Sequence, residues 1–394
     1  MMSMESKRAI ALKKDYHKRT IEDWIIILYG IYQEHNRLSN SHELWLQVVN
    51  DASQLAETVR RQIIRTKVSS EFNVYTQLAR LFCRVSAFIG RHIYDSESPL
   101  QHDPITELMR LKPLDDYIGG EERYEKWILW KYPYACPTCG NCPCVCAAYR
   151  DIMEDRNNPR YDDFWAKNVG QFVNKKNMYR QNEMGPNENV IKLYNSSIDN
   201  WVNMFYDIFG SGHIDMSLES IGFHFLEEIG EVSDGILCLN ELFKHERGIG
   251  VYRLGKIDLH QKILERASED PQYEKFKEEY KEKCPSGGEE LASEFAFSRL
   301  LEINISLTKE ELADVFSWMC AIINKIMAAN KYWNPDGQSL TISQVLHERY
   351  RTEDGTVGCS YCQRAICAHD CLMGSTIRKS IFKRNQKLNH RLFS

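Results

Sequence analysis

The chain has 394 residues, 43% hydrophobic and 27% charged, which is the composition of an ordinary globular protein with room for two or three domains. Its net charge of −5 argues against a general nucleic-acid-binding protein, and its longest apolar stretch, Trp24–Tyr32, is too short to span a bilayer. No apolar segment follows the basic residues near the N-terminus, so we expect a cytoplasmic protein that has no membrane partner.

Most of the chain is predicted to be helical. Apolar residues recur at steps of three and four, whereas strand and hairpin signals are sparse. We therefore predict an all-α fold with two bundles, each followed by a small cysteine-rich segment. In chain order the predicted parts are a first bundle (1–130), a cysteine-rich segment (131–150), a linker (151–190), a second bundle (191–350) with a helical insertion at about 244–295, a second cysteine-rich segment (351–375) and a basic tail (376–394).

Nine of the 13 cysteines lie in two short runs. CxxC pairs closed by a second pair of ligands are typical of structural Zn²⁺ sites, and such clustering in a reducing compartment indicates metal binding rather than disulfides. An iron–sulfur cluster or free thiols are the alternatives, and Cys142 or Cys371 could replace a neighbouring ligand. The predicted zinc ligands are Cys136, Cys139, Cys144 and Cys146 in the first run, and Cys359, Cys362, Cys367 and His369, at the same spacing, in the second.

Two acidic segments lie within the predicted second bundle. Glu227, Glu228 and Glu231 share one side of an amphipathic helix, and Glu311 and Asp314 share one side of a later helix. If the two helices pack side by side, their like charges require a cation, and carboxylate oxygens suit Mg²⁺ or Mn²⁺. The alternative is a solvated acidic face, but strongly apolar sequence surrounds both segments.

The pattern EExxE followed by ExxD resembles the signature of the MazG-like all-α NTP pyrophosphohydrolases, a superfamily that includes dimeric dUTPases. The resemblance covers Trp201–Leu242 and Leu300–Ala329. It implies a helical bundle that binds Mg²⁺ and cleaves a nucleoside triphosphate between its α and β phosphates. Carried over by position, the metal ligands would be Glu227 or Glu228, together with Glu231, Glu311 and Asp314.

The chain contains a candidate internal repeat. Ile21–Trp24 matches Ile198–Trp201 at an offset of 177, and both cysteine runs share one spacing. Chance alignment of two amphipathic helices is the alternative, which the shared cysteine spacing weakens. In the first copy only one acid, Asp51, is kept and the others become uncharged or basic, so we expect it to have kept the fold and lost the metal site: Asn50, Asp51 and Gln54 stand for Glu227, Glu228 and Glu231, and Gln77 and Arg80 stand for Glu311 and Asp314.

The leading functional hypothesis is a Mg²⁺-dependent nucleoside triphosphate pyrophosphohydrolase that releases pyrophosphate and a nucleoside monophosphate. Glu228, Glu231, Glu311 and Asp314 would hold the metal, and Glu227 would act as general base. Asn324 and Lys325 are candidates for phosphate contacts. Trp201 and Trp318 are candidates for the walls of a base pocket, with core packing as the alternative for both.

The rival hypothesis is a zinc-stabilised regulatory protein that binds nucleotides or nucleic acid without turnover. It would use the cysteine-rich segments and the basic tail, which contains no acidic residue and is otherwise a solvated terminus. The sequence identifies neither the preferred nucleotide nor the oligomeric state, and a homo-oligomer remains open.

Overall fold

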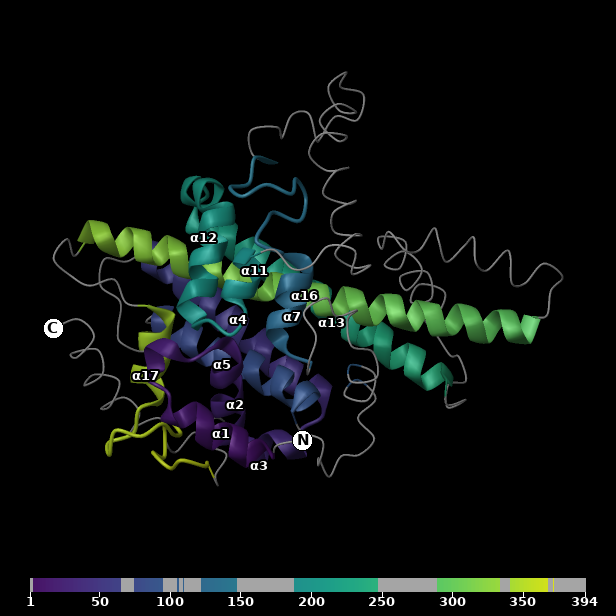
Figure 1. Ribbon diagram of the computed structural model, residues 1–394, viewed down its shortest axis with the longest axis horizontal. Coiled ribbons are helices and arrows are strands. Elements are labelled where there is room, and N and C mark those ends of the chain that lie inside the picture. The colour runs from purple at the N-terminus through teal and green to yellow at the C-terminus, as the bar shows by residue number, and fades with distance from the viewer. Residues whose placement is uncertain are drawn as a thin grey trace, which may run out of the picture.

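The computed structural model shows an all-α protein (Figure 1). No strand occurs among the residues it describes, where the only β-type pairing is an isolated antiparallel bridge between Arg351 and Val357. Nor is any helix in that part of the chain long and apolar enough to cross a membrane. The described residues are 3–64, 74–94, 105, 109, 122–146, 188–246, 289–333, 341–367 and 371.

The helices fall into two similar sets, which we call the first half (through residue 146) and the second half (from residue 188). Those of the first half are α1 (Met4–Lys13), the 3₁₀ turn η1 (Tyr16–Lys18), α2 (Ile21–Ile31), α3 (Gln33–Leu38), α4 (Ser41–Ile64), α5 (Val74–Ile93) and α7 (Tyr124–Lys131). Those of the second half are α11 (Glu188–Leu193), α12 (Ile198–Asp215), α13 (Leu218–Glu246), α16 (Glu289–Trp333) and α17 (Ile342–Tyr350).

Local sequence explains where the key helices begin. Thr20 and Thr341 cap α2 and α17, and in each case the residue three positions later, Asp23 or Gln344, bonds back to the backbone N–H of the threonine. This capping box satisfies two backbone donors that the first helical turn leaves open. These caps define Ile21 and Ile342 as the first residues of the two helices.

One continuous hydrophobic core joins the two halves. Its largest fully buried side chains include Trp24, Trp127 and Trp201. Within the halves, α4 packs along α5 and α13 packs along α16, and α4 also packs against α13. Figure 1 shows α16 crossing the whole molecule. The shared core places the acidic segments of α13 and α16 beside each other.

The two halves make equivalent contacts. The backbone N–H of Cys144 donates to the carbonyl of Ile208 over 2.6 Å, and the N–H of Cys367 donates to the carbonyl of Ile31 over 2.7 Å. Ile31 and Ile208 are related by the offset of 177 that the sequence repeat predicts. Each cysteine-rich segment thus docks on the opposite half of the chain.

The terminal helices are exchanged in the same way. Helix α7 of the first half packs against α16, and α17 of the second half packs against α5. The Tyr124 hydroxyl donates to the carbonyl of Leu312, and the Tyr350 hydroxyl donates to that of Ala79. A duplication would produce such reciprocal contacts, so they support our interpretation of the repeat.

Some predicted segments fall outside the described residues. These include nearly all of the linker and of the helical insertion, as well as the basic tail. The two ends of the predicted insertion belong to the end of α13 and the start of α16. The division into separate domains remains a prediction.

Candidate functional site

Three glutamates from two helices converge in the second half. Glu228 and Glu231 lie one turn apart on α13, and Glu311 lies on α16. Each offers a carboxylate oxygen, and these oxygens lie within 4.8 Å of one another. We call these residues the three-glutamate group. The pairing of EExxE with ExxD that the sequence predicted therefore brings at least three of the acids together.

Only one of the two oxygens of the Glu228 carboxyl group has a hydrogen-bond partner among the described residues. Its Oε1 accepts a hydrogen bond of 3.0 Å from Trp318 Nε1, while its Oε2 is buried and has no hydrogen-bond partner among the described residues. Burial, followed by the charges of Asp314, Glu231 and Glu311, raises the pKa of Glu228 to about 9. A buried oxygen without a partner, beside further carboxylates, fits a hard divalent cation such as Mg²⁺ or Mn²⁺.

Asp314 is engaged by the first half of the chain. Lys131, the last residue of α7, forms an ion pair with Asp314, and the hydroxyl of Tyr132 donates to the other carboxylate oxygen. The Lys131 ammonium also lies 3.9 Å from Glu311 Oε2. Burial raises the pKa of Asp314 to about 6, although the charge of Lys131 opposes this shift.

Lys131 is a permanent cation at this site. Burial alone would lower the pKa of its ammonium group, but the charges of Asp314, Glu311 and Glu310 outweigh burial and raise it above the usual value. Sequence reasoning missed Lys131 and Tyr132 altogether. Nothing in the local sequence around them indicates a contact with residues so far along the chain.

The equivalent place in the first half is filled by arginine. Arg80 bonds to Asp51 over 2.9 and 3.0 Å and donates to Gln54 Oε1 over 3.2 Å. Arg84 also contacts Asp51, over 3.2 Å, and the Asp51 side chain is 1% exposed. Asp51 and Gln54 are the repeat counterparts of Glu228 and Glu231. The guanidinium groups therefore lie where the second half gathers carboxylates, the arrangement expected of a half that has lost its metal site.

The other predicted residues have varied surroundings. The Glu227 side chain is exposed and lies 3.2 Å from His224 Nδ1. Asn324 donates to the carbonyl of Val202 over 3.2 Å, and Lys325 donates to that of Ile214, so both bind the backbone of α12. Trp201 is fully buried in the core, the alternative that the sequence left open.

Trp318 has a different setting from Trp201, because its indole binds Glu228 and packs against two histidine rings. The ring centroids of His224 and His213 are 4.8 and 5.2 Å from it. Burial, with the neighbouring His224, lowers the pKa of His213 to about 4, so His213 is neutral at pH 7. The two histidines were not singled out from the sequence.

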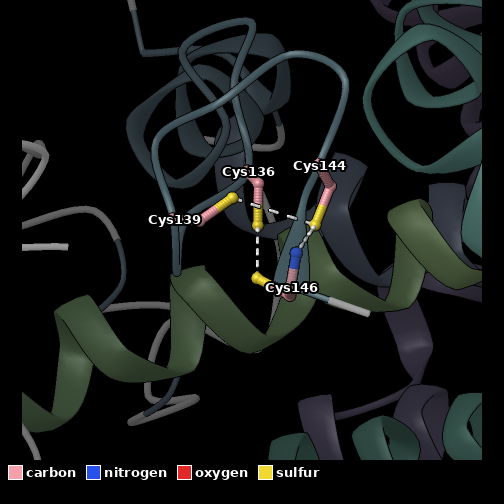
Figure 2. Close-up of side chains that lie close together, drawn as sticks. All are labelled: Cys136, Cys139, Cys144 and Cys146. Atoms are coloured by element: carbon pink, nitrogen blue, oxygen red, sulfur yellow. Dashed lines mark hydrogen bonds between the residues drawn. The ribbon is translucent and has the colours of Figure 1, made fainter. Parts of the chain in front are cut away.

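The first cysteine cluster (Cys136, Cys139, Cys144 and Cys146) gathers four thiols around one point (Figure 2). The Cys136–Cys146 and Cys139–Cys144 sulfurs are 3.8 and 3.9 Å apart. A tetrahedron with Zn–S bonds of about 2.3 Å has edges of about 3.8 Å, whereas a disulfide needs about 2.05 Å. The geometry fits a bound metal ion and not a disulfide.

The second cysteine cluster has the same geometry. Cys359, Cys362, Cys367 and Cys371 offer sulfurs within 4.8 Å of one another, and the Cys362 and Cys367 sulfurs are 3.9 Å apart. Cys371 takes the fourth position, a replacement that the sequence had left open. The predicted ligand His369 lies outside the described residues. Both cysteine clusters can thus hold zinc with four thiolates.

No protein-family model matches the chain, and searches of curated proteins and of solved structures find no match either.

Proposed function

We propose that the protein is a Mg²⁺-dependent nucleoside triphosphate pyrophosphohydrolase. The observation that carries the proposal is the three-glutamate group, in which carboxylate oxygens from α13 and α16 lie within 4.8 Å of one another, and one buried oxygen of Glu228 has no hydrogen-bond partner among the described residues. A hard cation would stabilise this cluster, and triphosphates are recognised through such cations.

Each side chain of the site would have a separate role in the reaction. Glu228, Glu231 and Glu311 would hold the divalent ion, and Trp318 orients the Glu228 carboxyl through its indole N–H. When bound, the ion would neutralise the triphosphate and acidify a water molecule. Glu227, exposed beside the group, would accept the proton of that water. Asp314 fixes Lys131 at the edge of the site.

The two cysteine clusters would carry structural zinc. Four thiolate ligands complete a tetrahedral site and leave no position open for chemistry. Metal analysis should find two zinc ions per chain, and Cys139→Ser and Cys362→Ser should each reduce the count to one. Cys142→Ser is the control, because Cys142 is exposed and lies outside the first cluster.

The test is pyrophosphate release from a panel of NTPs and dNTPs with Mg²⁺ or Mn²⁺. We expect Glu231→Gln to abolish release because it removes a metal ligand, and Asp314→Asn to abolish it because Lys131 loses its partner. Glu219→Gln, on the first turn of the same helix, is the matched control and should retain full activity. Activity that survives both substitutions would exclude the three-glutamate group as the site of hydrolysis.

One observation favours the rival function, a zinc-stabilised binding protein without turnover. Lys131 on Asp314 resembles Arg80 on Asp51, so a cation of the protein compensates an acid in both halves. In that case nucleotides, or nucleic acid through the basic tail, would bind without any release of pyrophosphate. Calorimetric binding in the absence of turnover, and unchanged by Glu231→Gln, would favour this function.

A further inference from the structure

Four carboxylates meet at the candidate site, but only three of them form the group that converges on one point. The fourth, Asp314, has its two oxygens bound to Lys131 and Tyr132. The Lys131 ammonium lies between Asp314 and Glu311, 3.9 Å from the Glu311 oxygen. One positive charge of the protein thus already lies next to the position that the three glutamates offer to an ion.

The ammonium shares a carboxylate with the three-glutamate group, as a second metal ion would. In two-metal phosphoryl-transfer sites the ions lie about 3.5–4 Å apart and share carboxylate ligands. Glu311 is shared here in the same sense, since it belongs to the three-glutamate group and also faces Lys131.

We propose that Lys131 is a tethered cation that takes the place of a second metal ion, so that the site binds one divalent ion, at Glu228, Glu231 and Glu311. The proposal rests on the metal site of the proposed function but not on turnover. It assigns Lys131 a positioning role, because the charge of Lys131 decides how many ions the acids accept.

In the first half, two side-chain cations contact the acid at the equivalent position. Arg80 and Arg84 both contact Asp51, so side-chain cations provide all the positive charge found at that position among the described residues. Guanidinium groups are always charged and bind carboxylates in a fixed geometry, which leaves no place for an ion. In the second half a single ammonium contacts Asp314 and Glu311, beside the three glutamates whose oxygens lie within 4.8 Å of one another.

The surroundings of Lys131 hold it in place. Its side chain is 17% exposed, the next residue donates to Asp314, and the docked first cysteine cluster follows a few residues later. Because α7 already packs against α16, little additional conformational entropy is lost when the ammonium binds. A free ion would have to displace a cation that is always present at the site.

The experiment counts Mn²⁺ ions by electron paramagnetic resonance in titrations of the zinc-loaded full chain. Ions bound elsewhere are subtracted with Glu231→Gln in the same background. We expect one Mn²⁺ per wild-type chain and two in Lys131→Met, which keeps the length of the side chain and removes its charge. Lys131→Arg, the conservative variant, should bind one.

Two Mn²⁺ ions in the wild type, or a single ion in folded Lys131→Met, would overturn the proposal. If Lys131→Met fails to fold, Asp314→Asn gives a second reading. It should keep one bound Mn²⁺, because the three glutamates remain, and loss of that ion would overturn the proposal by making Asp314 a required ligand.

The same measurements distinguish failure of the proposed function from failure of the role assigned to Lys131. Wild type that binds one Mn²⁺ but releases no pyrophosphate would disprove the hydrolase and leave the role of Lys131 standing. Release of pyrophosphate by a wild type that holds two ions would do the reverse.

Discussion

The two halves of this chain share their helix packing and their docking contacts, yet they neutralise buried acid in opposite ways. In the first half, Arg80 and Arg84 come from α5, the helix that packs beside Asp51, so the ion pairs close within one half. In the second half, Lys131 comes from α7 of the other half and reaches only one edge of the cluster. In the first half the cations contact Asp51 from the neighbouring helix, whereas in the second half the cation contacts Asp314 and Glu311 at one side of the three-glutamate group.

The strongest way to break this comparison is to remove a closing arginine. Arg84→Ala leaves the buried Asp51 carboxylate with Arg80 as its remaining guanidinium partner, and a lost hydrogen bond to a charged group costs about 1.5–3 kcal/mol. We expect a loss of that size in the free energy of unfolding measured with urea. Arg60→Ala is the control, since the Arg60–Glu57 pair is exposed, and should leave the unfolding midpoint unchanged. A loss as small as that of the control would show that the arginines are not structural.

The second half should respond to pH through its metal affinity. Without an ion, Glu228 has a pKa of about 9 and is protonated at pH 7, so binding must release its proton. The affinity for Mn²⁺ should therefore rise by about tenfold per pH unit from 7 towards 9 and level off above that. Titration calorimetry in buffers of different ionisation enthalpy would show the proton release. An affinity that does not change over this range would contradict the assigned role of Glu228.

A smaller difference between the two halves involves the first turns of α2 and α7 in the first half, and of α12 and α17 in the second. Ser343 N–H and its hydroxyl donate to Asp199 in the second half. In the first half the equivalent contact, 3.4 Å from Glu125 N–H to Glu22, brings two buried carboxyl groups together. Burial raises the pKa of Glu22 to about 7, although the charge of Arg123 opposes this shift. Burial and the neighbouring Glu22 raise the pKa of Glu125 well above its usual value.

Because these folded-state pKa values exceed those of the unfolded chain, the protonated pair stabilises the fold below about pH 4.5, and that contribution is lost as the pH rises through 7. Glu125→Gln removes the ionisable group and should stabilise the protein more at pH 8 than at pH 5. Thermal unfolding at the two pH values measures the difference. An equal effect at both would show that the carboxyl groups do not titrate in this range.

The sequence predicted those features that depend on local spacing. Helical periodicity gave the all-α class, and the spacings within the cysteine runs placed seven of the eight thiols that form the two clusters. The convergence of Glu228, Glu231 and Glu311 followed from two short motifs on helices that pack together. In the repeat, the replacement of Asp314 by Arg80 pointed to the closed arginine site.

The contacts of Lys131 and Tyr132 with Asp314 were missed. The pairing of Lys131 with Asp314 depends on α7 lying against α16, which only the exchange of terminal helices explains. No periodicity reports such an exchange, since both helices would show the same apolar stripe against any partner. Trp201 was ambiguous for a related reason, because an aromatic residue on an apolar face has the same spacing in a core and in a pocket.

The exchange of the cysteine-rich segments also bears on the order in which the chain can mature during synthesis. Cys144 docks on Ile208, which the ribosome adds later, so the first half is made before its docking surface exists. Final assembly must wait until α12 and α16 have emerged and can receive α7. A fragment that ends in the linker would lack both Ile208 and α16, the two surfaces on which the first half docks.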